Sequence, residues 1–357
     1  MLARINSFGL SGIEGFPVSV EIDIGNGLPG IEIVGLPDTA TKESKERVRS
    51  ALKNSGFRLS PKRVTVNLAP ADMKKEGSAF DLPIALGMLC ATEQLSSVGL
   101  GDAIFVGELS LGGELGKVNG ILPILLAAKE AGYRRAVIPA GNAEEASFVS
   151  GIDTYAFPDL RSVTAYLAGG NALPLEVRDP QAAAADAHGE DLKYVKGQYA
   201  ARRAMEIAAA GGHNILMIGP PGGGKTMLAK CLPSILPDMS AEEMLETTKI
   251  HSVAGMLEGG IVCRRPFRSP HHTASRIALT GGGASARPGE MSLAHNGVLF
   301  LDELPEYPRA TLEILRQPVE DGRITVSRAA RSVDYPARFM LVASMNPCPC
   351  GNYGSAD

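Results

Sequence analysis

The chain has 357 residues, of which 45% are hydrophobic and 21% charged, and its formal net charge is −4. This length allows about two domains, and the slight acidity excludes a protein that coats nucleic acid over its whole surface. No apolar leader and no run of about 18 apolar residues is present, and the five cysteines form no obvious disulfide framework. These features predict a cytoplasmic protein without a membrane span.

Residues 1–168 alternate between strand and helix patterns and predict an α+β domain. Apolar and polar side chains alternate over 18–24, as in a half-buried strand. Further strands are expected at 31–34, 64–68 and 136–138, with a short one ending at 106. Helices are expected at 38–56, 82–95 and 122–131, and Asp38 can cap the first of them.

Residues 169–192 are small and polar without an apolar face, and they predict a linker. Residues 193–357 then predict an α/β domain. Its continuous apolar runs suit buried parallel strands, and helices between such runs imply a sheet covered on both faces. The runs lie at 215–218, 298–301 and 339–343, and a helix is expected at 200–210.

A glycine-rich segment directly follows the first of these runs. It reads Gly219-Pro220-Pro221-Gly222-Gly223-Gly224-Lys225-Thr226 and matches the P-loop pattern G-x-x-x-x-G-K-[ST]. Its backbone N–H groups and the helix N-terminus after it predict a phosphate cradle for ATP. We expect Lys225 to reach the β- and γ-phosphates and the Thr226 hydroxyl to hold Mg²⁺. A glycine-rich loop without function is the alternative, but it does not account for the strand–loop–helix context.

Two carboxylates end the second apolar run. We expect Asp302 to complete the Mg²⁺ shell, mainly through water, and Glu303 to orient and polarise the attacking water. An apolar run that ends in Asp-Glu is common, so this assignment depends on the upstream loop. Asn346, after the third run, is the candidate sensor of the γ-phosphate or the water, and an ordinary strand-end asparagine is the alternative. Gln198, just before the helix at 200–210, is the candidate contact to adenine.

The order of these motifs, and the residues between them, resemble a known family. A strand–loop–helix, then Asp-Glu, then a strand-end asparagine is the order of AAA+ ATPases. Four further segments resemble the Mg-chelatase-like ComM/YifB family, namely 265–273, 281–283, 287–297 and 346–351. The resemblance covers nearly the whole chain and implies an AAA+ motor in a homo-oligomeric, hexameric ring. Such a motor acts on branched or single-stranded DNA during natural transformation.

The first domain resembles the N-terminal domain of that family, which is similar to the Lon protease domain and has a ribosomal-S5-like fold. Lon-type proteases pair a serine nucleophile with a lysine. By its spacing, the nucleophile position falls on Ala79, with Ser78 one residue off, and the lysine position falls on Ile124. An apolar Ile124 cannot activate a serine. We therefore expect a non-proteolytic domain used for binding or assembly.

The resemblance leaves two alternative functions open. The magnesium chelatase motor subunit has a similar AAA+ module, which makes metal insertion an alternative, although that subunit does not usually carry a Lon-like domain. A non-hydrolysing ATP-binding scaffold is the other. The resemblance places the helical lid of the AAA+ module beyond Asp357, so we expect this chain to bind Mg-ATP weakly and to hydrolyse it poorly.

Three local features invite further hypotheses. The segment 264–289 holds five arginines and no acidic residue, and it is the candidate DNA contact; a solvated loop or a subunit contact in the ring is the alternative. The adjacent His271 and His272 favour loop packing or phosphate contact over a metal site. Cys348 and Cys350 can present two thiolates, which are too few for Zn²⁺ unless further ligands follow beyond the chain end.

Overall fold

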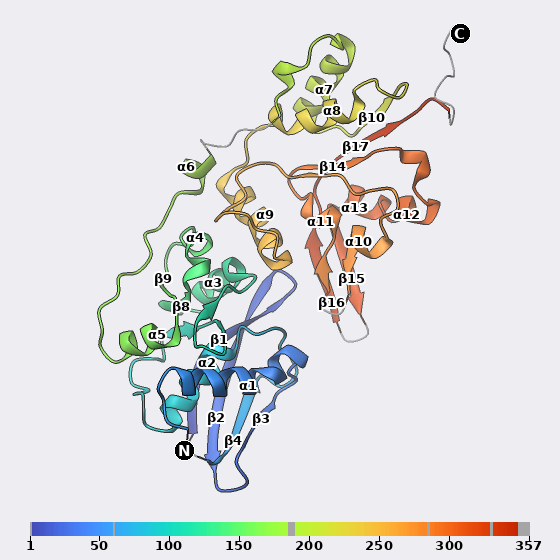
Figure 1. Ribbon diagram of the computed structural model, residues 1–357. Helices are drawn as coiled ribbons and strands as arrows, with labels where there is room; N and C mark the ends of the chain where they lie inside the picture. Colours follow the sequence, from blue (N-terminus) through green and yellow to red (C-terminus); the bar gives the residue numbers. More distant parts are fainter. Residues whose placement is uncertain (1, 60, 185–189, 284–285, 329–330, 349–357) are drawn as a thin grey trace. The chain divides into compact units, whose positions relative to one another are not determined.

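The computed structural model describes residues 2–59, 61–184, 190–283, 286–328 and 331–348 (Figure 1). The chain divides into two compact units, Met1–Arg178 and Asp179–Asp357, and each is described by itself. Within the described residues, no helix combines the length and the apolar character needed to cross a membrane.

The first unit is built on a four-stranded sheet with the order β1-β2-β4-β3. Its strands are β1 (Leu2–Ser11), β2 (Glu14–Gly25), β3 (Gly30–Val34) and β4 (Arg63–Ala69). Strand β2 is antiparallel to β1 and β4, whereas β3 runs parallel to β4. The alternation expected over 18–24 lies within β2, where Val18, Val20 and Ile22 are buried. The strands expected at 31–34 and 64–68 are β3 and β4.

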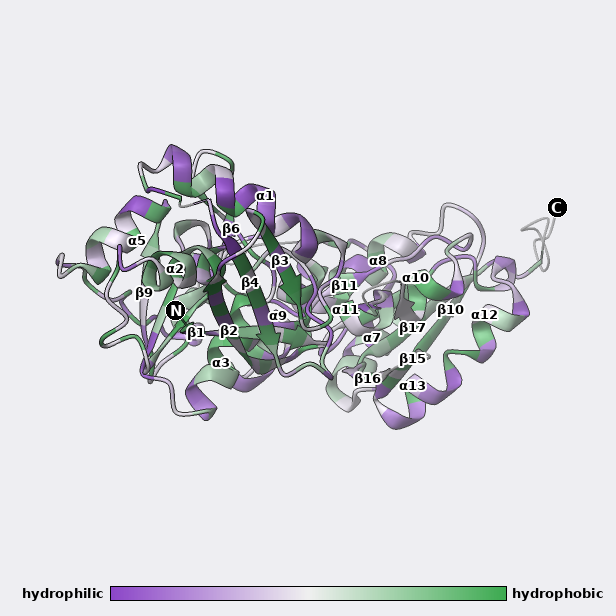
Figure 2. Cartoon of the chain, turned by 90° about the horizontal axis from the view of Figure 1, so that it is seen from below, coloured by the Kyte–Doolittle hydropathy of each residue, from purple (hydrophilic) through white to green (hydrophobic). Residues whose placement is uncertain are grey.

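Three helices pack on or beside this sheet, and one of them is α3 (Ile121–Glu130), which contacts β1 and β2. Helix α2 (Asp81–Ala91) packs on β1 and β2, and α1 (Thr39–Asn54) packs on α2. The Asp38 carboxylate caps α1 by accepting a hydrogen bond of 2.7 Å from the Thr41 N–H, as predicted. Every residue of α2 is buried, so its sequence has no polar face, and it ends earlier than expected. Figure 2 shows hydrophilic residues along much of the outer helix α1.

A second, three-stranded sheet completes the first unit. Its order is β5-β8-β9 and all pairs are parallel. The strands are β5 (Ala103–Phe105), β8 (Arg135–Pro139) and β9 (Asp153–Phe157). The unit also contains the helices α3 (Ile121–Glu130), α4 (Ala143–Ala146) and α5 (Leu160–Leu167). A short antiparallel pair is formed by β6 (Glu108–Leu109) and β7 (Leu115–Gly116). The predictions at 122–131 and 136–138 correspond to α3 and β8. The ribosomal-S5-like arrangement stays a prediction.

The second unit contains a four-stranded parallel sheet with the order β10-β17-β14-β11. The strands are β10 (Ile215–Ile218), β17 (Met340–Met345), β14 (Val298–Leu301) and β11 (Phe267–Arg268). Strand β17 therefore lies between the strands that carry the P-loop and the Asp-Glu pair. The expectation of buried strands is correct for β14 and wrong for β10, in which Leu216 is 48% and Ile218 60% exposed. Within the described residues, β10 is an edge strand that pairs on one side only.

The remaining elements of the second unit surround this sheet or project from it. The helices are α6 (Pro180–Ala184), α7 (Tyr199–Gly211), α8 (Lys225–Cys231), α9 (Ala241–Ala254), α10 (Arg276–Thr280), α11 (Glu290–Leu293), α12 (Arg309–Glu313) and α13 (Arg316–Asp321). Strand β12 (Gly281–Gly282) pairs with β13 (Arg287–Pro288). Strand β15 (Arg323–Arg328) pairs with β16 (Arg331–Pro336), and Figure 1 shows these two side by side.

Part of the predicted linker 169–192 is structured. Helix α6 lies within it and packs on α9, so this part of the linker belongs to the second unit. The physical reason is local: proline suits the first turn of a helix, and alanine is the strongest helix former.

Candidate nucleotide-binding site

The predicted nucleotide residues lie at one edge of the parallel sheet of the second unit. Strands β10, β17 and β14 are adjacent and parallel, so the loops at their carboxyl ends share that edge. In the loop between β10 and α8, Gly222 and Gly224 have left-handed φ angles of 74° and 78°. A Cβ at Gly222 would contact nothing within 4 Å. Backbone conformation, and not space, is therefore what selects glycine at this position.

Lys225, the first residue of α8, is held at the mouth of this loop. Its ammonium group donates hydrogen bonds to the carbonyl oxygens of Gly219 and Pro220, at 2.7 and 2.9 Å. It also donates to Asn346 Oδ1 at 3.1 Å. Asn346 directly follows β17, and the position of that strand explains how two residues so distant in sequence meet. The structure thus brings the predicted sensor to the P-loop lysine.

Thr226 and Asp302 form a second contact at this edge. The Thr226 hydroxyl donates to Asp302 Oδ2 at 2.7 Å. The other carboxylate oxygen, Oδ1, accepts from the hydroxyl of Ser344 and, at 3.0 Å, from the N–H of Glu303. Burial raises the pKa of Asp302, but the hydrogen bonds from Ser344 and Thr226 outweigh it and hold the pKa below its usual value. Asp302 is therefore ionised at neutral pH.

Sequence analysis missed Ser344. Its side chain is fully buried in β17, the strand that pairs with β14, after which Asp302 lies. A hydroxyl in an otherwise apolar strand was the available signal, but the strand order was needed to use it.

The residues at this edge fit Mg²⁺ and ATP. Hydroxyl and carboxylate oxygens are the hard ligands that Mg²⁺ prefers, and those of Thr226 and Asp302 lie side by side. The first N–H groups of α8 have no partner within the helix and point toward the loop, where they favour phosphate. Lys225 adds a cation beside them. The array is thus suited to hold a triphosphate and its metal ion together.

Gln198, the candidate adenine contact, lies beside the P-loop. It precedes α7 with a left-handed φ of 49°, and its side-chain amide donates to the carbonyl of Gly223 at 3.4 Å. The structure therefore places Gln198 next to the phosphate-binding segment. Its contact to adenine stays a prediction.

Glu303 has a partner that sequence analysis did not foresee. Its Oε2 lies 3.3 Å from Nδ1 of His272, on the loop that follows β11. The ring of His272 stacks at 4.1 Å on that of His271. Within the described ranges, no group of three or more His, Cys, Asp and Glu side chains could hold a metal ion. The histidine pair therefore belongs to the surroundings of Glu303.

Two of the five arginines in the predicted DNA-contact segment have carboxylate partners within the fold. Arg265 is 15% exposed and donates to Glu243 and to three backbone carbonyl groups. Arg268 makes a bidentate ion pair with Glu290, at 2.6 and 2.7 Å. Both carboxylates lie outside the segment 264–289, so its sequence alone shows no ion-pair partner for these arginines. These two arginines hold the fold together.

The other three arginines of this segment are exposed. They are Arg264, Arg276 and Arg287, and none forms an ion pair with another described residue.

The remaining predicted sites are only partly described. Cys350 lies outside the described residues, so the Zn²⁺ hypothesis with Cys348 stays a prediction. In the first unit, Ser78, the residue before Ala79, donates a hydrogen bond from its hydroxyl to Glu108. Ile124 is buried within α3. The absence of protease activity likewise stays a prediction.

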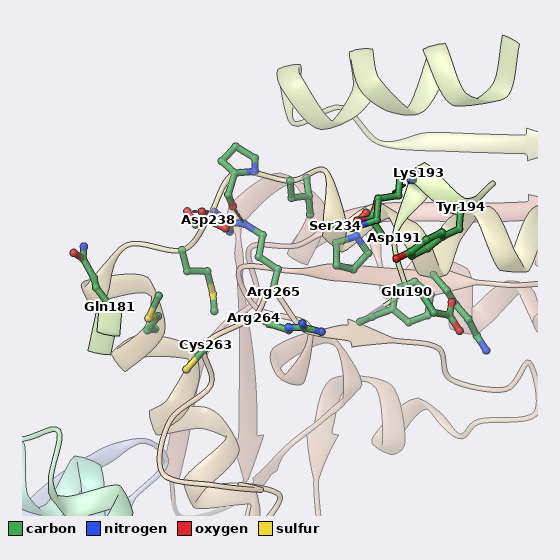
Figure 3. Close-up of a pocket in the computed structure, with 17 residues that line it drawn as sticks. Gln181, Glu190, Asp191, Lys193, Tyr194, Ser234, Asp238, Cys263, Arg264 and Arg265 are labelled. Carbon is green, nitrogen blue, oxygen red and sulfur yellow. Dashed lines mark hydrogen bonds and ion pairs between the residues drawn. The ribbon is translucent and has the colours of Figure 1, made fainter. Parts of the chain in front are cut away.

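The second unit has a groove with a volume of about 1190 Å³ (Figure 3). Its lining mixes acidic and basic side chains, among them Glu190, Asp191, Lys193 and Arg264. It reaches Lys230 in the last turn of α8, whereas the P-loop lies at the first turn. Neither the P-loop nor Asp302 and Glu303 line it. The groove is therefore not the phosphate-binding site.

Comparisons with known proteins agree with the geometry. Residues 191–357 match the family described as magnesium chelatase, subunit ChlI, and residues 20–142 match subunit ChlI of Mg-chelatase. The chain is 49% identical to competence protein ComM of Haemophilus influenzae, over 99% of this chain and 70% of that protein. It is 48% identical to the uncharacterized protein YifB of Escherichia coli, over 99% and 69%. It is 27% identical to the magnesium-chelatase 38 kDa subunit of Cereibacter sphaeroides, over 43% and 51%. The chain therefore belongs to the Mg-chelatase-like ComM/YifB family of AAA+-type ATPases.

Proposed function

We propose that this protein is a Mg²⁺-dependent ATPase motor that acts on branched or single-stranded DNA. The observation that carries the ATPase part is the pair of contacts at the sheet edge, Lys225 with Asn346 and Thr226 with Asp302. These contacts join the P-loop to the ends of β17 and β14, the next two strands of the sheet. They gather a cation, an amide, a hydroxyl and a carboxylate around one point.

Each residue has a defined task in this proposal. Bound Mg-ATP supplies the γ-phosphoryl group that water attacks in line. Thr226 and Asp302 hold the metal ion, and Lys225 stabilises negative charge on the phosphate oxygens. Glu303 accepts a hydrogen bond from the attacking water and orients it. Asn346 reports the presence of the γ-phosphate through its contact with Lys225.

The DNA part of the proposal has separate support. A relative that is 49% identical is named a competence protein. Three exposed arginines of this chain, Arg264, Arg276 and Arg287, have no carboxylate partner among the described residues, and such side chains can bind the phosphate backbone without sequence preference. We further propose that the active form is a homo-oligomeric ring. Sedimentation of the protein with and without Mg-ATP measures its oligomeric state and tests this proposal.

The decisive experiment measures ATP hydrolysis by the full-length gene product with and without forked DNA. We expect DNA to raise the rate and Lys225→Ala to abolish it. Replacing Arg264, Arg276 and Arg287 by glutamine should remove the stimulation and leave the basal rate. Arg203→Gln, at an exposed arginine of α7, is the matched control. A rate that forked DNA does not change would contradict the DNA-motor hypothesis and favour metal insertion or a scaffold role.

A further inference from the structure

The loop after β11 and the Asp-Glu pair after β14 lie at the same edge of the sheet. Strands β11 and β14 are paired in parallel, with Phe267 opposite Val298, so their carboxyl ends point the same way. This pairing brings His272 next to Glu303, with 3.3 Å between Nδ1 and Oε2. A proton on Nδ1 makes the imidazole a hydrogen-bond donor to the carboxylate.

The ring of His272 has aromatic neighbours on two sides. The ring centroid of His271 lies 4.1 Å away with the two rings tilted by 35°, and Tyr307 lies edge-on at 6.4 Å and 79°. The Tyr307 hydroxyl donates to the carbonyl of Pro270 at 2.6 Å. Burial raises the pKa of Tyr307 to about 12, so the hydroxyl keeps its proton. Tyr307 thereby ties the histidine loop to the segment that follows Glu303.

Glu303 is itself set in an unusual backbone conformation. Its φ of 53° is left-handed, a conformation that is unfavourable for a residue other than glycine. The Asp302 carboxylate accepts hydrogen bonds from Thr226 and Ser344, whereas the Glu303 carboxylate lies next to His272. Among the described residues, His272 is the only side chain in polar contact with the Glu303 carboxylate. That contact uses Oε2.

We propose that His272 is a positioning residue for Glu303. It fixes Oε2 and leaves Oε1 to accept a hydrogen bond from the attacking water. This inference rests on the proposed ATPase function and deepens it by naming what orients the glutamate. His272 acts by orienting Glu303, because its contacts among the described residues are with Glu303, His271 and Tyr307 and not with the P-loop or Asp302.

The test separates the donor from the ring. His272→Phe keeps an aromatic ring against His271 and Tyr307 but removes the donor, whereas the amide of His272→Asn places a donor near the position of Nδ1. In the full-length gene product, we expect His272→Phe to lower kcat by roughly tenfold to a hundredfold, because a small misplacement of a reacting group has effects of that size. KM and the Kd of a fluorescent ATP analogue should change less than about twofold. We expect His272→Asn to recover most of kcat, and His213→Phe, at an exposed histidine, to leave it unchanged.

A second measurement shows whether His272 acts through Glu303. In a Glu303→Gln background under single-turnover conditions, His272→Phe should have no further effect. An unchanged kcat in His272→Phe, or an equal loss in both backgrounds, overturns the inference. If His272→Phe does not fold, His272→Ala and His272→Asn decide by the same comparison. Wild-type protein without Lys225-dependent turnover would instead contradict the proposed function, so the two failures are distinguishable.

Discussion

At the scale of single residues, the site depends on oxygen atoms placed within hydrogen-bond distance of one another. Thr226 offers one hydroxyl, 2.7 Å from Asp302 Oδ2, and its methyl group takes no part in that contact. We predict that Thr226→Ser keeps most of the Mg²⁺-dependent activity. Thr226→Val keeps the shape but not the oxygen, and should raise the Mg²⁺ concentration for half-maximal ATP hydrolysis about tenfold or more. A Mg²⁺ titration of the ATPase rate checks this, and equal curves for both variants would contradict the role of Thr226.

At the scale of elements, His295 joins the starts of the two central strands of the second unit. Its Nδ1 accepts a hydrogen bond of 3.1 Å from the backbone N–H of Arg338, just before β17, while His295 itself lies just before β14. Nε2 therefore carries the proton, and it lies 3.0 Å from Glu246 Oε2. Burial lowers the pKa of His295, although Glu246 opposes this. A second proton on Nδ1 would break the bond to Arg338.

This junction makes the stability of the second unit depend on pH. The unfolded chain takes up a proton at His295 near pH 6.5, whereas the folded chain does so only at a lower pH. The free energy of unfolding should therefore fall as the pH decreases below about 6.5. We predict that His295→Gln is destabilised at pH 7 and that its difference from wild type narrows toward pH 5. Urea unfolding at both pH values measures this, with His213→Gln as control. A difference that does not depend on pH would contradict it.

Comparison of these elements with the sequence shows which features were predictable. The P-loop and Asp302-Glu303 are contiguous in sequence, so spacing alone located them. Ser344 and His272 reach Asp302 and Glu303 only because β17 and β11 flank β14, and strand order cannot be obtained from a single sequence. The apolar run of β10 could not distinguish an edge strand from a central one. The ion pair of Arg268 with Glu290 could not be predicted for the same reason, because the fold brings the two residues together.

At the scale of the whole molecule, each unit has a hydrophobic core of its own. One cluster of buried side chains runs from Ala3 to Val163, and another from Leu192 to Val342, and neither includes residues of the other unit. The first unit also contains a buried ion pair, in which Arg47 donates to the fully buried Asp81 at 2.7 and 3.1 Å. Removing the cation would leave that carboxylate without its charge partner.

We therefore predict two separate thermal transitions in calorimetry of the intact chain, because a domain with its own core unfolds as a unit. Arg47→Met should lower the temperature of only one transition, because the unpaired Asp81 carboxylate reduces the free energy of unfolding of the first unit by about 3 kcal/mol. Mg-ATP at about a hundred times its Kd should raise the temperature of only the other transition, because binding adds about 2.7 kcal/mol to the free energy of unfolding of the second unit. Lys225→Ala should remove the effect of Mg-ATP and leave that of Arg47→Met. A single transition that both perturbations shift would show that the two units unfold together, in spite of their separate cores.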